Sequence, residues 1–378
     1  MMDQLTVDVH DRKCKLLTPL GAFHSLSVTP VWNGIGTAAL TVPARHHRAP
    51  LLAADGARLA ISFRGKQILT GPIHQVGGSG PERSGYSTYA LTGDFQMLND
   101  FRGWPNPLGT AAQQGDEGTN WVRRGPAETV LKDLVRQNIV QRANIAGRLG
   151  YPLNIPDTQG RGATIDVSIR MHKLYDKLFP AVDTASLGVV FGMGDGYLTM
   201  DVTQPRVRPN PLRESDRVIQ KWDYQGQTPT VTDGVVGGQG QGTARVFQTF
   251  GDTARAVKYG RIIETFIDAR DTSDGETHAM RGASALAEGA ARGTMRVTLA
   301  EAGTFRLGVD DYWVGDFVTA QAGPFTFADV LREVTITQDQ SAGLRISATI
   351  GPDNSPERAV TEAISRLARN VGDLRTGR

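Results

Sequence analysis

The chain of 378 residues contains a single cysteine, Cys14, which excludes an internal disulfide and any cysteine-based zinc site. It has no run of 18 apolar residues, the length that a membrane-spanning helix needs. An excess of one charge is missing too, because 41 Lys and Arg against 39 Asp and Glu leave a net charge of +2. That balance argues against a dedicated nucleic-acid binder, whose footprint is a concentrated basic surface.

Charged residues among alternating apolar ones make the first thirty residues unlike a secretory signal. We therefore expect a protein that stays, or assembles, in a reducing cytoplasm. No period of 20–50 residues repeats along the chain, which disfavours solenoids and propellers.

Glycine is abundant, with 44 residues in the chain, about 12 % against a usual ~7 %. In the first hundred residues glycine turns separate short segments, such as 5–9 and 59–63, in which apolar and polar residues alternate. This period of two predicts half-buried strands joined by hairpins. We predict a first β-barrel-like domain over residues 1–105.

The pattern changes over residues 106–205, where we predict a mixed α/β domain. Residues 109–125 are polar and rich in Gly and Gln, which predicts a long surface loop. Pro126 suits the first position of a helix, and a second helix is expected around residues 174–182. Residues 189–202 read as a hairpin with a glycine-rich turn.

Strand patterns return over residues 206–352, a second predicted β-barrel-like domain with a helical insert near 276–292. The predicted fold class is therefore α+β, mostly antiparallel β, with two barrel-like domains on either side of the mixed domain. Residues 353–378 form a predicted C-terminal helix, too short to be stable alone, so its apolar stripe should dock on another part of this chain or on another chain. The predicted docking residues are Val360, Ile364, Leu367 and Val371.

No catalytic, cofactor-binding or metal-binding constellation emerges from the motifs. The glycines of residues 238–242 lead into a strand pattern rather than a helix, which disfavours a nucleotide site. His46 and His47 are adjacent, so they point to different faces and cannot form a helical ligand pair. Cys14 has no evident base beside it. We predict a protein that is not an enzyme.

Two functional alternatives stay open at this stage. A cell-wall hydrolase could use carboxylates among Asp195, Asp310 and Asp311, because an acid pair for glycoside cleavage has no fixed sequence spacing. Aspartate also favours turns without any catalytic role. A host-glycan adhesin could use aromatic side chains as a sugar platform. The five tryptophans, dispersed along the sequence, are Trp32, Trp104, Trp121, Trp222 and Trp313.

Several short stretches occur in an order that resembles one protein family. They cover most of residues 5–350, and each one alone is a pattern typical of β-hairpins in general. The stretches are 23–44, which includes Trp32-Asn33-Gly34, 61–73 with Thr70-Gly71-Pro72, 235–240, 259–268, and Val314-Gly315-Asp316 within 314–318. This ordered set resembles the minor tail proteins of long-tailed phages of actinobacteria, the ReqiPepy-type siphovirus tail family, which is related to baseplate hub proteins.

The resemblance implies a homotrimeric tail-tip hub in the virion. Two similar barrels per chain would alternate around the axis, so that three chains adapt a six-fold tail to a three-fold tip and let DNA pass. Implied partners are the distal tail protein, the end of the tape-measure protein and downstream minor tail or receptor-binding proteins. No cofactor and no membrane span are implied.

Overall fold

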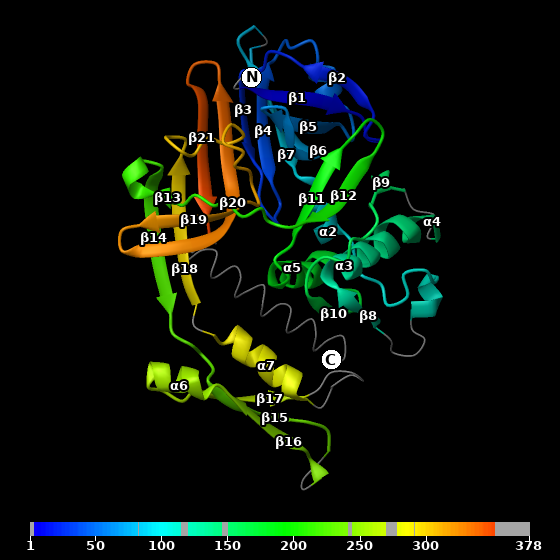
Figure 1. Ribbon diagram of the computed structural model, residues 1–378. Coiled ribbons are helices and arrows are strands. Elements are labelled where there is room, and N and C mark those ends of the chain that lie inside the picture. Colours follow the sequence, from blue (N-terminus) through cyan, green and yellow to red (C-terminus); the bar gives the residue numbers. More distant parts are fainter. Residues whose placement is uncertain are drawn as a thin grey trace. The chain divides into compact units, whose positions relative to one another are not determined.

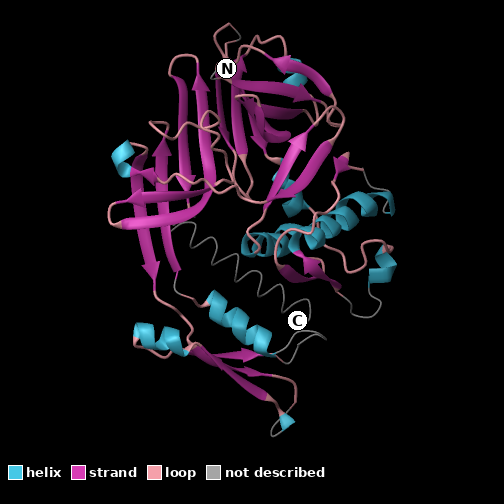
Figure 2. Ribbon diagram, viewed as in Figure 1, coloured by secondary structure: helices cyan, strands magenta, loops and turns pink. Residues whose placement is uncertain are grey.

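The computed structural model describes residues 4–81, 83–114, 120–145, 150–240, 244–269, 278–290 and 292–351. Strands dominate and pair mostly antiparallel (Figures 1 and 2), which confirms the α+β prediction with mainly antiparallel sheet. The chain divides into two compact units. Unit 1 comprises Met1–Lys221 with Val297–Ile350, and unit 2 comprises Trp222–Arg296 with Gly351–Arg378.

One large sheet contains strands from both predicted barrel-like regions. Its strands are β1 (Leu5–His10), β2 (Leu16–Leu20), β3 (Ser25–Thr29), β4 (Thr37–Pro43), β5 (Arg58–Phe63), β6 (Lys66–Ser79), β7 (Tyr86–Thr92), β13 (Leu212–Arg213), β14 (Ile219–Gln227), β18 (Arg292–Ala300), β19 (Phe317–Ala322), β20 (Phe325–Asp339) and β21 (Gly343–Ile350). They follow the path β14-β18-β21-β20-β3-β4-β7-β6-β5-β1-β2, with β19 and β13 joined beside β20.

The two strand-rich regions meet where β20 pairs with β3, with Ile336 opposite Val28. The path ends at β14 and β2, so no barrel closes within the described residues, and the two barrel-like domains of the prediction are not confirmed. Alternation of apolar residues identifies strands and their buried face, but it carries no information on which strand lies beside which. The apolar sides of these strands are buried, including Leu26, Leu40 and Ile336.

Two long strands turn corners in this sheet. The first half of β6 pairs with β5 and its second half with β7, with a register shift between Ile73 and Gln75. Strand β20 pairs first with β19 and then with β21, with a register shift between Leu331 and Glu333. A bulge bends a strand and increases its twist, which lets one strand serve two ladders at an angle.

The middle part of unit 1 is mixed α and β, and its helices bury an apolar core against small sheets. Strand β10 pairs with β8, and β11 pairs with β12, which in turn pairs with β9. The elements are β8 (Trp121–Pro126), α3 (Ala127–Val135), a π-helical turn (Arg136–Gln141), α4 (Arg142–Ile145), β9 (Leu153–Asn154), β10 (Thr164–Ile169), α5 (Leu174–Thr184), β11 (Gly188–Met193) and β12 (Leu198–Thr203).

Strand β8 corrects the predicted surface loop over residues 109–125. Trp121, at its start, is buried, whereas most of the strand is exposed or half-buried. The segment is a strand because β10 provides its ladder, with Val167 opposite Arg123. That partner lies about forty residues away in the sequence, so local composition could not reveal it.

Short helical segments fill the remaining connections of unit 1. Met97 and Leu98 are buried in the second of the two consecutive turns that follow β7. These segments are α1 (Ala49–Leu52), η1 (Asp94–Gln96), α2 (Met97–Asp100), η2 (Ala111–Gln114) and η5 (Glu214–Asp216).

Unit 2 contains a three-stranded sheet of its own, in the order β16-β15-β17. Helix α7 packs on β15 and β16, with Gly282 against the ring of Phe250. The elements are β15 (Asp233–Gly237), β16 (Phe247–Gly251), α6 (Thr253–Tyr259), β17 (Glu264–Asp268) and α7 (His278–Glu288). The four predicted docking residues, Val360, Ile364, Leu367 and Val371, lie outside the described residues. Among the described helices, none is both long and apolar enough to cross a membrane.

Candidate functional site

A pocket of about 660 Å³ lies in unit 1, where the N-terminal strands, the β11–β12 hairpin and the turn before β19 come together. Three of the stretches that carry the family resemblance line it. They contribute Trp32, Gly34 and Gly36 from the first stretch, Ile68, Leu69 and Thr70 from the second, and Val314, Gly315 and Asp316 from the last. Stretches that are far apart in the sequence thus converge on one place.

Trp32 is packed between two glycines on different segments. A Cβ added to Gly188 would lie 1.9 Å from the Trp32 ring, and a Cβ added to Gly315 would lie 2.1 Å from it. Gly315 also has a φ of +92°, a conformation that side chains other than glycine rarely adopt. Glycine is therefore required at both places, because any side chain would have to displace the indole.

Two amide side chains attach strand β11 to the N-terminal strands. Asn33 Nδ2 donates to the Leu187 carbonyl (2.8 Å), and Val189 N–H donates to Asn33 Oδ1 (2.9 Å). Gln67 repeats this arrangement further along, because its Nε2 donates to the Met193 carbonyl (3.1 Å) and its Oε1 accepts from the Met193 N–H (2.7 Å). Each amide thus imitates the edge of a neighbouring strand.

Asp316 organises a turn in the wall of the pocket. Its carboxylate accepts hydrogen bonds from Arg206 Nε (3.0 Å), Arg208 Nε (2.9 Å) and the Trp313 N–H (2.9 Å), and its side chain is only 4 % exposed. Lys66 lies across this turn, with its ammonium 4.4 Å from the centre of the Trp313 ring. Desolvation lowers the pKa of Lys66, and the positive charge of Arg206 lowers it further.

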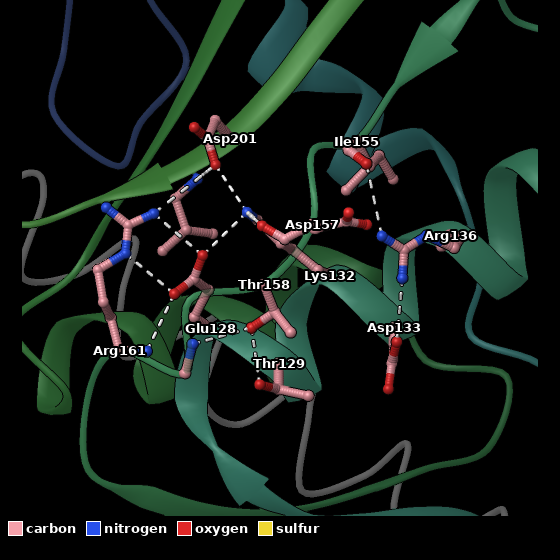
Figure 3. Close-up of polar contacts among 12 residues, drawn as sticks. Glu128, Thr129, Lys132, Asp133, Arg136, Ile155, Asp157, Thr158, Arg161 and Asp201 are labelled. Carbon is pink, nitrogen blue, oxygen red and sulfur yellow. Dashed lines mark hydrogen bonds and ion pairs between the residues drawn. The ribbon is translucent and has the colours of Figure 1, made fainter.

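A buried ionic network lies beside the pocket (Figure 3). Lys132 Nζ is 2.9 Å from Glu128 Oε1 and 2.8 Å from Asp201 Oδ1, and neither Lys132 nor Glu128 is exposed. Arg161 donates to both oxygens of Glu128 at 2.9 and 3.0 Å. Burial alone would raise the pKa of Glu128, but hydrogen bonds from Arg161 and Lys132 outweigh it and hold that pKa far below its ordinary value. Asp201 is also part of the pocket lining.

The carboxylates considered for glycoside cleavage are all engaged in structural contacts. Asp195 accepts from the Leu16 N–H (2.9 Å). Asp310 binds Arg306, whose hydrogen bond lowers the pKa of this carboxylate. Asp311 has a lowered pKa because the charges of Arg206 and Arg208 outweigh desolvation. A general acid needs a raised pKa, which neither Asp310 nor Asp311 has.

The remaining predicted candidates are dispersed. Cys14 is buried, which raises its pKa, and His46 stacks on His47 with ring centres 4.8 Å apart. Trp32 and Trp313 both line the pocket, a convergence that their spacing in the sequence does not indicate. Across the described ranges no group of three or more His, Cys, Asp or Glu side chains is arranged to hold a metal ion.

A family model described as Siphovirus ReqiPepy6 Gp37-like protein matches residues 6–352. The chain belongs to this family of phage tail proteins. The resemblance inferred from the sequence is thereby confirmed. No curated protein sequence matches the chain.

Solved structures of tail proteins share the fold of this Gp37-like family member. The 43 kDa tail protein of prophage MuSo2 from Shewanella oneidensis has a TM-score of 0.57 at 9 % identity, covering 92 % of this chain and 97 % of that one. The prophage tail protein gp18 from Listeria monocytogenes EGD-e has a TM-score of 0.53 at 12 % identity, covering 96 % and 99 %. The tail protein from Neisseria meningitidis MC58 has a TM-score of 0.52 at 12 % identity, covering 92 % and 97 %.

Proposed function

We propose that the chain is a structural hub at the tip of a long non-contractile phage tail, where three copies form a ring. Each copy would contribute two strand-rich modules, one from about residues 1–105 and one from about 206–352, at alternating positions. Such a ring presents six near-equivalent positions and can adapt a six-fold tail to a three-fold tip around a channel for DNA. Family membership and the shared fold of tail proteins support this role.

The observation that carries the proposal is the likeness of the two corner strands. Strand β6 passes from its ladder with β5 to its ladder with β7, and β20 passes from β19 to β21 while also pairing with β3; both shift register at the corner, at Ile73/Gln75 and at Leu331/Glu333. A pseudo-six-fold ring needs two modules with comparable edges. The corner strand is the last strand but one in each module, β6 before β7 and β20 before β21, which meets that need. The two regions are joined by the β20–β3 ladder, which holds one module beside the other within a copy.

The ends of the large sheet supply edges for contacts between copies. In the part of the chain that the structure describes, β2 pairs only with β1 and β14 only with β18. An unpaired edge exposes backbone donors and acceptors and is an aggregation hazard in a free monomer. Pairing edges between copies in a closed ring removes this hazard, which favours a ring over a monomer.

The C-terminal segment is the proposed docking element for one neighbour in the tail. On a helix, Val360, Ile364, Leu367 and Val371 would form one apolar stripe that needs a partner. Proposed neighbours are the distal tail protein, the end of the tape-measure protein, and a downstream minor tail or receptor-binding protein. The proposal includes no catalytic step, and assembly would take place in the host cytoplasm before incorporation into the virion.

The decisive experiment measures the mass of the purified full chain by light scattering and images tail tips by electron microscopy with the subunit labelled. The expected result is a trimer in solution, with label on the tail axis in three-fold symmetry. A monomer at all concentrations, together with label away from the axis, would show that the chain is not the hub.

A further inference from the structure

Most charges that line the pocket are already compensated. Asp94, Asp201, Arg206 and Asp316 each form at least one ion pair at or beside the pocket. Their partners are Arg58 for Asp94, Lys132 and Arg161 for Asp201, Asp311 and Asp316 for Arg206, and Arg206 and Arg208 for Asp316. Buried or half-buried charges in proteins are normally paired in this way.

Lys66 is the exception among these lining residues. Within the described ranges its ammonium forms no ion pair and lies over the ring of Trp313, 4.4 Å from the ring centre. Desolvation lowers the pKa of Lys66; among the more distant charges, Arg206 and Arg208 lower it further while Asp316 and Asp311 raise it, and none of the four forms an ion pair with the ammonium. An ammonium without a direct ion pair, on an otherwise mainly apolar wall, favours a ligand that carries an anionic group.

Strand β11 offers an unpaired edge to the same pocket. It is the end strand of the sheet β11-β12-β9, beside β6 (Figure 1). Backbone groups of alternate residues in a strand point to the same edge. Val189 and Met193 donate their N–H groups to Asn33 and Gln67 on this edge, so the N–H and C=O of Phe191, midway between them, point there too.

No described group of the protein hydrogen-bonds to the Phe191 N–H or C=O on that edge. Asn33 and Gln67 occupy the positions on either side, so the free stretch of edge is short. It accommodates one residue of an incoming extended chain, which would form two backbone hydrogen bonds as in strand addition. The volume of about 660 Å³ lies in the range of pockets that enclose a ligand or several side chains.

We propose that the pocket binds an extended peptide segment of a partner protein that pairs with the backbone of Phe191, inserts an apolar side chain and places a carboxylate against Lys66. The backbone contact selects an extended chain, the mainly apolar wall selects an aliphatic or aromatic side chain, and Lys66 selects the acidic residue. The inference rests on the proposed function only for the source of the segment, another protein of the same tail.

The test measures binding of short synthetic peptides to the full-length protein by fluorescence polarisation. Each peptide carries an aliphatic or aromatic residue, followed two positions later by Glu, Gln or Lys, because alternate side chains of an extended chain lie on one face. The Glu peptides should bind at least about tenfold more tightly than the Gln and Lys peptides, because both of these lack the carboxylate that would form a charge-assisted hydrogen bond with Lys66.

Protein variants separate the role of Lys66 from a general effect of charge. Lys66→Ala should abolish the preference for Glu over Gln, whereas Lys13→Ala, an exposed lysine away from the pocket, should retain it. Unfolding midpoints of both variants show whether the fold is intact. A peptide N-methylated at the residue that pairs with Phe191 should bind more weakly, because it loses a donor.

Equal binding of Glu and Lys peptides to the wild-type protein would overturn the proposal. So would a Lys66→Ala variant that weakens Glu and Gln peptides equally, or a result in which Lys66→Ala disrupts self-association instead, because the occupant would then be a second copy. A monomeric protein that still prefers Glu peptides would refute the hub and leave the peptide site standing.

Discussion

The backbone of Gly315 lies directly against the indole of Trp32, so that a Cβ at position 315 would approach the ring to 2.1 Å. Replacing Gly315 by Ala therefore adds two costs, a left-handed backbone of roughly 1–2 kcal/mol and displacement of a packed ring of roughly 1–3 kcal/mol. We expect Gly315→Ala to lower the free energy of unfolding by about 3 kcal/mol in urea denaturation.

Gly343 provides the matched control for this substitution. Its φ is +74°, but nothing lies within 4 Å of an added Cβ. Gly343→Ala should therefore cost only the backbone term, about 1 kcal/mol. Equal losses for the two variants would mean that the contact with Trp32 contributes nothing to stability.

In the wall of the pocket, the Asp316 carboxylate binds two arginines and a backbone N–H, and Asp316→Asn removes the charge of that carboxylate. We expect the free energy of unfolding to fall by about 2 kcal/mol, because the arginines lose a buried, hydrogen-bonded anion. Asp310→Asn is the comparison, since Asp310 pairs with the largely exposed Arg306 and should contribute less than about 1 kcal/mol. A larger effect at Asp310 would contradict the central role of Asp316.

The lowered pKa of Glu128 leads us to expect that the stability of the protein depends on pH. Its pKa is depressed in the folded protein, so the folded state keeps the carboxylate ionised where the unfolded chain binds a proton. The stabilisation is fully present above the unfolded-state pKa of about 4.3 and is lost as the pH falls below that value. We expect Glu128→Gln to lower the free energy of unfolding by about 3 kcal/mol at pH 7. The difference in unfolding free energy between this variant and the wild type should become smaller below pH about 4.

The control for Glu128 is Asp133→Asn, because Asp133 pairs with Arg136 on the surface of the same helix. It should cost less than about 1 kcal/mol at pH 7. A difference between wild type and Glu128→Gln that stays constant down to pH 3 would show that the depressed pKa of Glu128 does not contribute to folding.

The C-terminal stripe can be tested without removing it. Leu367→Asp should leave the urea midpoint of the protein unchanged and reduce incorporation of the chain into tails, because it places a charge on the expected apolar face. Ser365→Asp adds the same charge to another face of the expected helix and should be tolerated. Deletion of residues 353–378 should reproduce the effect of Leu367→Asp, and complete tails assembled from the deleted chain would refute the docking role.

Local sequence patterns predicted those elements whose causes are local. The hairpin expected over residues 189–202 forms as β11 and β12 because its glycine-rich turn and alternating residues are adjacent in the chain. Strand β8 was missed because only Trp121 in it is buried, so no alternation marks it, and its ladder comes from β10.

The pocket could be predicted only in fragments. The resemblance identified the stretches around Trp32 and Gly315 as characteristic. Nothing in the sequence shows that the Trp32 ring packs on the Gly315 backbone. The spacing of Glu128 and Lys132 on a predicted helix indicates an ion pair at i,i+4. Arg161 and Asp201 join that pair from separate elements, and such contacts depend on tertiary packing.

The ladder between β3 and β20 joins residues near position 28 to residues near position 336. A ribosome adding about 5–20 residues per second needs on the order of 15–60 s to make the intervening chain. Throughout that time β3 has its β4 neighbour but lacks the one on its other side. The nascent polypeptide thus carries an open β edge through most of its translation, and a premature stop anywhere before β20 leaves that edge uncovered for good.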